Sequence, residues 1–215
     1  MPDRLVELKN GRWLLGLQEY NKELKLWEQY LYYSDDKGKT WSDRITVCKD
    51  PRYSLCEVSV VELNNGVLVA FMRENSGMGY DGMKAFSYDH GESWDGPYHL
   101  PLPGCHRPTA GYLKSGRILI TYRFMQGGKG WFVHWSQNLF AALMDEESVL
   151  ARERKDQASS IMPIDYDRGM YPDCGYSGWV QFDDGEIYIV NYIVDDALLA
   201  HIRGYSIRES DFKVG

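Results

Sequence analysis

Chemically reactive side chains recur at the same spacing around four glycines of this chain. Nine residues before three of these glycines stand an acid, a base and a phenol, namely Glu57, Arg107 and Tyr176, while the first repeat has Pro2. Seven residues after the four glycines stand Gln18, Arg73, Arg123 and Tyr192. Side chains alternate along a strand, so one register can direct all of them to one end of the molecule. Clustered arginines can attract an anionic small ligand even on an acidic protein.

The four glycines belong to an internal repeat. The segments 5–18, 60–73, 110–123 and 179–192 align on the turn glycines Gly11, Gly66, Gly116 and Gly185. Each segment has an apolar strand, a polar turn that ends in glycine, and a second apolar strand. This pattern is typical of a β-hairpin and predicts an all-β chain.

A second motif follows the first two hairpins. Residues 34–41 are SDDKGKTW and residues 87–94 are SYDHGESW, so both fit S-x-D-x-G-x-[ST]-W. We expect the Asp to cap backbone N–H groups of a tight turn, the Gly to take a positive φ, and the Trp to pack beneath. The motif resembles the Asp-box of the sialidase (neuraminidase) superfamily, whose BNR repeats form β-propellers.

This resemblance implies a sialidase-like six-bladed β-propeller of four-stranded blades, with about four blades in this chain. Repeats of about fifty residues suit one blade each. We predict a single domain over residues 1–215, with blades at about 1–53, 54–104, 105–170 and 171–215. The resemblance further implies two blades before Met1. An arc of four blades would expose blade edges, so we expect self-association.

The third and fourth repeats depart from this pattern. The motif of the third repeat is expected near Ser136, where SQNLFAAL lacks its Asp, Gly and Trp. Residues 141–156 are predicted as the only helix, between the third and fourth blades. No such motif is visible in the fourth repeat.

The resemblance also implies roles for the reactive residues. The segment from Glu57 to Arg73 resembles the sialidase unit in which a Glu on one inner strand is followed by an Arg on the next. Tyr176 and Ser177 resemble the Tyr-Ser pair at the head of a later inner strand. By that resemblance Tyr176 is the nucleophile, Glu57 its general base, and Arg73 binds the substrate carboxylate.

These roles are chemically consistent. A neutral tyrosine avoids the repulsion that a carboxylate nucleophile would meet at an anomeric centre that already bears a carboxylate. A phenol with a pKa near 10 needs a neighbouring base, and the planar fork of arginine binds a carboxylate with two hydrogen bonds.

Other parts of the family pattern are incomplete here. Sialidases use three arginines and an Asp general acid, and the acid and one arginine would precede Met1. The remaining arginine of the family pattern would fall near Arg123 or Lys129, and Arg107 is an additional basic residue. His106 is a candidate for a sugar hydroxyl or for the channel wall. We expect Asp173 to cap a turn, and the candidates for stacking on a sugar are Trp131, Trp135 and Trp179.

Composition limits the partners. The net charge of −7 argues against nucleic acid. The first residues carry no signal-peptide pattern, and no run approaches eighteen apolar residues. The chain is therefore predicted to be soluble and to lack a membrane segment. The sequence does not assign a cellular compartment. The four cysteines form no CxxC pair and lack histidines at ligand spacing, so we expect buried thiols and neither a metal nor another cofactor.

Three functional hypotheses follow. The first is a retaining exo-glycosidase that cleaves a terminal acidic sugar, with sialic acid as the default substrate. The second is a non-catalytic propeller that binds a glycan or a protein partner, or a truncated inactive homologue. The third is a hydrolase for a different sugar. An enzyme needs the general acid, and a neutral sugar would not need Arg73 beside Arg107 or Arg123.

Overall fold

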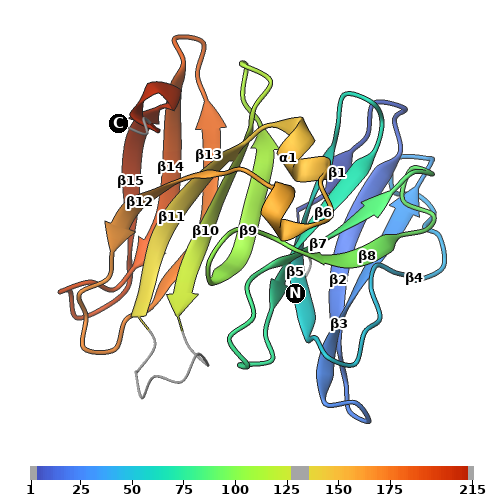
Figure 1. Ribbon diagram of the computed structural model, residues 1–215, viewed down its shortest axis with the longest axis horizontal. Helices are drawn as coiled ribbons and strands as arrows, with labels where there is room; N and C mark the ends of the chain where they lie inside the picture. The colour runs from blue at the N-terminus through green and yellow to red at the C-terminus, as the bar shows by residue number, and fades with distance from the viewer. Residues whose placement is uncertain (1–3, 127–135, 213–215) are drawn as a thin grey trace.

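The computed structural model describes residues 4–126 and 136–212, which form four antiparallel sheets arranged as the blades of a propeller (Figure 1). The first blade comprises β1 (Val6–Glu7), β2 (Trp13–Asn21), β3 (Leu26–Ser34) and β4 (Ile45–Thr46). The second comprises β5 (Leu55–Glu62), β6 (Leu68–Glu74), β7 (Met83–Ser87) and β8 (Asp95–His99). The third comprises β9 (Cys105–Tyr112), β10 (Ile118–Gln126), β11 (Ser136–Met144) and β12 (Ser160–Tyr166).

The fourth blade contains three strands within the described residues: β13 (Cys174–Gln181), β14 (Glu186–Ile193) and β15 (His201–Arg208). The predicted all-β propeller is thus confirmed, although this blade shows three strands where four were expected. The four hairpin glycines have φ between 84° and 87°, a left-handed conformation that glycine adopts at little cost. The innermost strands β5, β9 and β13 contact one another in that order, which brings the heads of three blades together.

Three apolar cores lie between successive blades. Strand β6 shows how they form, because Leu68, Ala70 and Met72 pack toward the first blade while Val69 and Phe71 pack toward the third. Both faces of this strand are therefore buried, which explains its continuous apolar sequence. The third core joins the third and fourth blades, with Ile187 and Ile189 of β14 at its centre. These cores fix the positions of the inner strands relative to one another.

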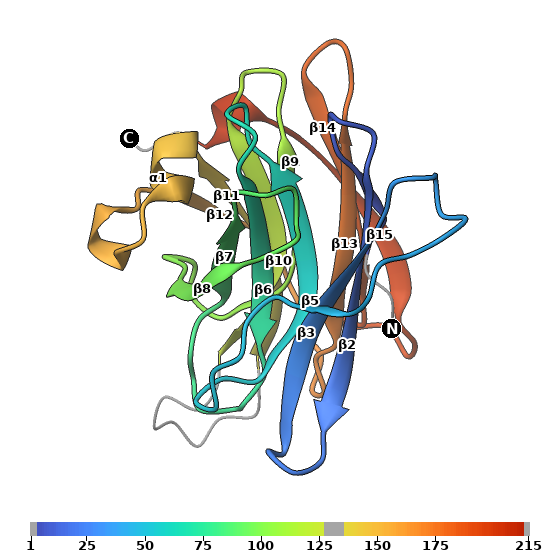
Figure 2. The same cartoon turned by 90° about the vertical axis from the view of Figure 1, so that its right-hand side faces the viewer.

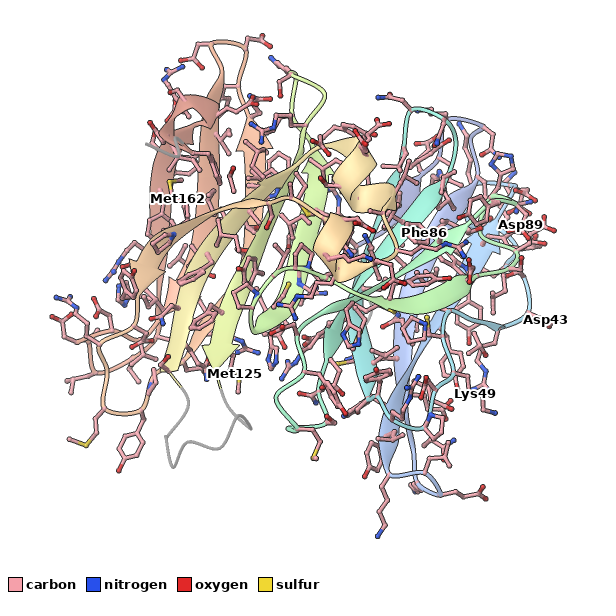
Figure 3. The ribbon with its side chains drawn as sticks, in the orientation of Figure 1. Asp43, Lys49, Phe86, Asp89, Met125 and Met162 are labelled. Atoms are coloured by element: carbon pink, nitrogen blue, oxygen red, sulfur yellow. The ribbon has the colours of Figure 1, made fainter. Side chains whose placement is uncertain are left out.

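The two S-x-D-x-G-x-[ST]-W segments form the same turn after the third strand of their blades. In the first, the Asp36 carboxylate accepts the backbone N–H of Thr40 at 2.8 Å and the Ser34 hydroxyl at 2.8 Å. In the second, Asp89 accepts the backbone N–H of Ser93 at 2.9 Å and the Ser87 hydroxyl at 2.8 Å. Asp89 lies at the outer edge of the molecule (Figure 3).

The third blade shows that the motif position expected at Ser136 is wrong. Ser34 pairs with Trp13, and Ser87 pairs with Leu68, in each case two residues after a hairpin glycine. The residue that holds this register in the third blade is Met144, which pairs with Ile118. Residues 136–144 continue the strand, and the corner that follows contains a short helix in place of the turn.

The predicted helix over residues 141–156 is also largely wrong. Residues 141–144 complete β11, and the helical part is reduced to α1 (Glu146–Leu150) and the 3₁₀ turn η1 (Arg154–Asp156). Asp145 begins α1 because its carboxylate accepts the backbone N–H of Ser148 at 2.7 Å. The segment lies within the third blade, between β11 and β12, and not between the third and fourth blades. A further 3₁₀ turn, η2 (Glu209–Asp211), follows β15.

The α1–η1 segment lies beside β7 and β8 and away from β2 and β13 (Figure 2), so it joins the third blade to the second. Lys84 of β7 is fully buried, and its ammonium donates to the Val149 carbonyl at 2.5 Å and to the Gln157 amide oxygen at 3.0 Å. Arg154 adds an ion pair with Asp81 at 2.8 Å. Burial lowers the pKa of Lys84 to about 7.

Other expectations concern cysteines and membranes. The four cysteines are buried thiols without disulfides, as predicted. Among the residues that the structure describes, no helix is long and apolar enough to cross a membrane.

The buried ammonium of Lys84 gives a pH prediction. Between about pH 7 and pH 10 the unfolded chain holds a proton on Lys84 that the folded chain has lost, so the free energy of unfolding should rise with pH. The slope from this one proton is at most about 1.4 kcal/mol per pH unit. Urea unfolding at several pH values should show this slope in the wild type and its loss in Lys84→Met. Equal slopes in the two proteins would contradict it.

The fourth blade exposes an apolar face, on which Val190 is 41% and Ile202 is 73% exposed. We predict that the chain self-associates through this face, and that the double variant Val190→Lys, Ile202→Lys associates less, because charged side chains resist burial. Sedimentation velocity would measure both species. A monodisperse wild-type monomer of 24.9 kDa would contradict the prediction.

Candidate active site

Glu57, Arg107 and Tyr176 occupy the same unusual backbone conformation on three neighbouring inner strands. Their φ angles are 52°, 50° and 55°, in the left-handed region that non-glycine residues rarely adopt. Each lies at a break in the pairing register of its strand, on β5, β9 and β13 respectively. Such bulges re-aim a side chain, and left-handed non-glycine residues cost on the order of 1–3 kcal/mol each. The repeated distortion therefore presents three side chains in the same way.

Strands β5, β6 and β13 bring an acid, a guanidinium and a phenol into direct contact. The Tyr176 hydroxyl donates to Oε1 of Glu57 at 2.5 Å, across 119 residues of sequence. The Arg73 guanidinium donates from Nη1 to Oε2 of Glu57 at 3.0 Å, and from Nη2 to Asn75 at 2.6 Å. The Glu57 carboxylate is therefore held on both oxygens, one by a phenol of the fourth blade and one by an arginine of its own blade.

The environment keeps Glu57 ionised and Tyr176 protonated. Burial raises the pKa of Glu57, but the Arg73 charge, the Tyr176 hydroxyl and the Arg107 charge outweigh it, so the pKa lies below the usual value. The pKa of Tyr176 is raised by burial, by the hydrogen bond to Glu57 and by the Glu57 charge, while Arg123 and Arg73 oppose the rise. The proton of this hydrogen bond therefore stays on the Tyr176 oxygen.

Two further guanidinium groups face the Tyr176 ring. The centre of the Arg107 guanidinium lies 5.2 Å from the ring centroid, and that of Arg123 lies 5.6 Å away. Arg123 is held by the Gln137 amide oxygen at 3.1 Å and by the Cys174 carbonyl at 3.2 Å. A Cβ on Gly175 would lie 3.3 Å from Cδ of Arg123, so glycine allows this approach. Arg73, Arg107 and Arg123 are thus gathered around one phenol.

The residues seven positions after the hairpin glycines complete the site. Gln18 accepts the backbone N–H of Glu57 at 2.7 Å and so stabilises the bulge from the first blade. Tyr192 stacks on Tyr176, with ring centroids 6.1 Å apart and planes 22° apart. Its hydroxyl donates to Asp173 at 2.7 Å. The two registers therefore meet at one end of the inner strands.

His106 of β9 pairs with Arg123 of β10 and is partly buried. Burial, and then the charges of Arg73 and Arg123, lower the pKa of His106 to about 3. Its Nδ1 is buried without a hydrogen-bond partner among the described residues. His106 is therefore a neutral group at the arginine cluster.

Several other candidates are placed elsewhere. Trp179 packs in the core between the third and fourth blades and donates to the Thr109 carbonyl at 3.1 Å, so it is not a platform for a sugar. Asp173 does not cap a turn with its side chain, which points instead to Tyr192. Lys129, Trp131 and Trp135 lie outside the described residues. Over residues 4–126 and 136–212, no group of three His, Cys, Asp or Glu could hold a metal ion.

The Tyr176–Glu57 contact gives a third prediction. Glu57→Gln removes a negative charge beside the phenol but keeps a hydrogen-bond acceptor, so the pKa of Tyr176 should fall. Titration of ¹³Cζ-labelled tyrosines by NMR, with Tyr176→Phe used to assign the signal, would measure the change. An unchanged or raised pKa in Glu57→Gln would show that the two groups are not in contact in solution.

Comparisons with known proteins agree with this fold. A curated protein called a sialidase, from Paraclostridium sordellii, is 26% identical over an alignment of 110 residues that covers 44% of this chain and 26% of that protein. A crystal structure of a protein of unknown function from Dyadobacter fermentans is 25% identical, with a TM-score of 0.76, over 96% of this chain and 52% of that one. An α-L-arabinanase from Penicillium chrysogenum, 16% identical, has a TM-score of 0.65 over 98% of this chain and 62% of that one.

This chain therefore spans between about a quarter and three fifths of these relatives. The model of the BNR repeat-like domain matches residues 2–189, which is most of the sequence. The resemblance inferred from the hairpins and the two Asp motifs is thus confirmed. The chain belongs to the BNR repeat-like domain family, and its fold is that of the sialidase-like propellers.

Proposed function

We propose that the protein is a retaining exo-glycosidase of the sialidase type that removes a terminal acidic sugar, with sialic acid as the first substrate to test. The observation that carries the proposal is the 2.5 Å hydrogen bond from the Tyr176 hydroxyl to the ionised Glu57 carboxylate. A phenol in contact with a buried base is the arrangement that nucleophilic catalysis by tyrosine requires. The fold itself is shared by proteins with different activities, so the proposal rests on this site.

In the proposed reaction the Tyr176 proton passes to Oε1 of Glu57 as the phenol oxygen attacks the anomeric carbon. The bond to the leaving group breaks, the leaving group departs with the bonding electron pair and takes a proton from solvent water, and a glycosyl–tyrosine intermediate forms. A water molecule then attacks the same carbon from the side opposite Tyr176 and releases one proton to the solvent. The bond to Tyr176 breaks, and Glu57 returns the proton to the phenolate. Two inversions give net retention. The left-handed bulges of Glu57 and Tyr176 hold the two groups in line for this transfer.

The arginine cluster supports an acidic substrate. Arg73, Arg107 and Arg123 surround Tyr176, although the chain as a whole has a net charge of −7. Their local field favours an anion, and each can bind a carboxylate with two parallel hydrogen bonds. A carboxylate ligand would also draw Arg73 away from Glu57, which would make Glu57 a stronger base for Tyr176.

One observation favours the alternative of a non-catalytic glycan-binding propeller or an inactive homologue. Within the described residues the carboxyl groups placed at Tyr176 and its stacking partner are Glu57 and Asp173, and each lies beside an arginine. Neither is suited to protonate a leaving group. A hydrolase for a neutral sugar is less consistent with the three arginines.

The test is hydrolysis of an aryl sialoside, 4-methylumbelliferyl N-acetylneuraminide, because its phenolate leaves without a general acid. We expect turnover by the wild type, a reduction of about 10²–10⁴-fold in kcat for Glu57→Gln, and at least as large a loss for Tyr176→Phe. Tyr88→Phe, at an exposed tyrosine of the second blade, is the matched control and should keep full activity.

Two results would contradict the proposal. Full activity in Tyr176→Phe would exclude Tyr176 as the nucleophile. A wild-type protein that binds N-acetylneuraminic acid but does not cleave the aryl sialoside would be a binding propeller.

A further inference from the structure

Asp173 has a side chain that the local turn does not use. The carboxylate that organises the backbone here belongs to Asp167, which accepts the N–H groups of Gly169 at 2.8 Å and Asp195 at 3.0 Å through Oδ1. Its Oδ2 accepts the N–H of Asp173 itself at 3.0 Å. Because Asp167 performs the capping, the Asp173 carboxylate needs another explanation.

The Asp173 carboxylate lies at the edge of the candidate active site. Its Oδ1 accepts the Tyr192 hydroxyl at 2.7 Å and lies 3.7 Å from Nη1 of Arg123. Tyr192 stacks on Tyr176, and Arg123 lies over the Tyr176 ring. The Asp173 side chain is nevertheless 55% exposed, whereas that of Arg123 is 8% exposed. Asp173 thus joins the site through two of its members and remains open to solvent.

A carboxylate beside an arginine cluster restricts what can bind to it. An ionised carboxylate only accepts hydrogen bonds, so its ligand must offer an O–H or N–H donor. The acidic group of a substrate would be repelled there and attracted to the guanidinium groups. The site therefore has two chemically different sides, one of guanidinium groups and one of a carboxylate.

We propose that Asp173 is a specificity-determining residue that accepts a hydrogen bond from a hydroxyl or N–H group of the bound acidic sugar. This inference rests on the proposed function in so far as the ligand occupies the same site, but it concerns binding and not turnover. The carboxylate of the sugar then faces the arginines while a donor group faces Asp173, and this orientation places the anomeric carbon over Tyr176. Acidic ligands without donors lose this second contact.

A purely structural role for Asp173 predicts a different outcome. If Asp173 only held Tyr192 and Arg123 in place, its loss would weaken the binding of every anion in the same way. If Asp173 contacts the sugar, its loss weakens the binding of the sugar but not the binding of a plain carboxylate. A plain carboxylate should even bind more tightly, because a negative charge near Arg123 has been removed.

The experiment is calorimetric titration with N-acetylneuraminic acid and with cyclohexanecarboxylate, which has no hydroxyl or N–H donor. The proteins are the wild type, Asp173→Asn, Tyr192→Phe and Asp183→Asn. Tyr192→Phe keeps the stacked ring and removes only the hydroxyl that binds Asp173. Asp183→Asn makes the same charge change at the far end of the fourth blade, where Asp183 is fully exposed and paired with Lys114.

We expect Asp173→Asn to bind N-acetylneuraminic acid about ten- to a hundredfold more weakly, the size expected for the loss of a hydrogen bond to a charged group. Cyclohexanecarboxylate should bind Asp173→Asn as tightly as the wild type or more tightly. Tyr192→Phe should change sugar binding less than Asp173→Asn, and Asp183→Asn should match the wild type.

Three results would overturn the inference: unchanged sugar binding by Asp173→Asn, an equal loss for both ligands, or no binding of the sugar by the wild type. Its failure is distinct from failure of the proposed function. If the protein binds the sugar through Asp173 but does not cleave it, the proposed glycosidase activity is contradicted and the proposed role of Asp173 still holds.

Discussion

The site depends on one backbone constraint, the left-handed conformation shared by Glu57, Arg107 and Tyr176. None of these residue types prefers that conformation, and together the three cost several kcal/mol, on the order of 1–3 each. The distortion persists because strands β5, β9 and β13 are fixed by the apolar cores between blades. Gln18 of the first blade adds a hydrogen bond to the bulge at Glu57. The repeated blade thus supplies both the strain and the packing that offsets it.

Charge compensation is the second condition for the site. A buried carboxylate is stable only when it is paired, and Glu57 is paired with Arg73 on one oxygen and with Tyr176 on the other. Burial, the hydrogen bond to Glu57 and the Glu57 charge also raise the pKa of Tyr176, so the phenol stays protonated. Arg123 connects this centre to Asp173, and Tyr192 connects Asp173 back to the Tyr176 ring. Residues of the second, third and fourth blades therefore contribute to one electrostatic unit.

Much of this could be predicted from the sequence, because the repeat is regular. The spacing from each hairpin glycine correctly grouped Glu57, Arg107 and Tyr176, and it grouped Gln18, Arg73, Arg123 and Tyr192 as well. That spacing failed beyond the hairpin in the third blade. Strand β10 runs as far as Gln126, and β11 begins at Ser136 and ends at Met144. The corner after the third strand of this blade therefore comes at Met144 and not at Ser136.

Three other features carried no sequence signal. An Asp in the segment YPDCGY is typical of a turn cap, and only the hydrogen bonds of Asp167 show that the cap is elsewhere. Glu, Arg and Tyr give no indication of a positive φ, so the bulges that aim them could not be foreseen. Trp179 was a plausible sugar platform by residue type, but tertiary packing places it in a core.

The central claim is that Tyr176 forms a covalent bond to the sugar, and one measurement tests it most directly. A sialic acid that carries fluorine at the anomeric carbon and on the neighbouring carbon has a good leaving group and forms an intermediate that hydrolyses slowly. After incubation, intact-mass and peptide mass spectrometry should find one glycosyl group per chain, attached to the peptide that contains Tyr176, and none in Tyr176→Phe. An unmodified wild-type protein, or a glycosyl group on another residue, would contradict the account.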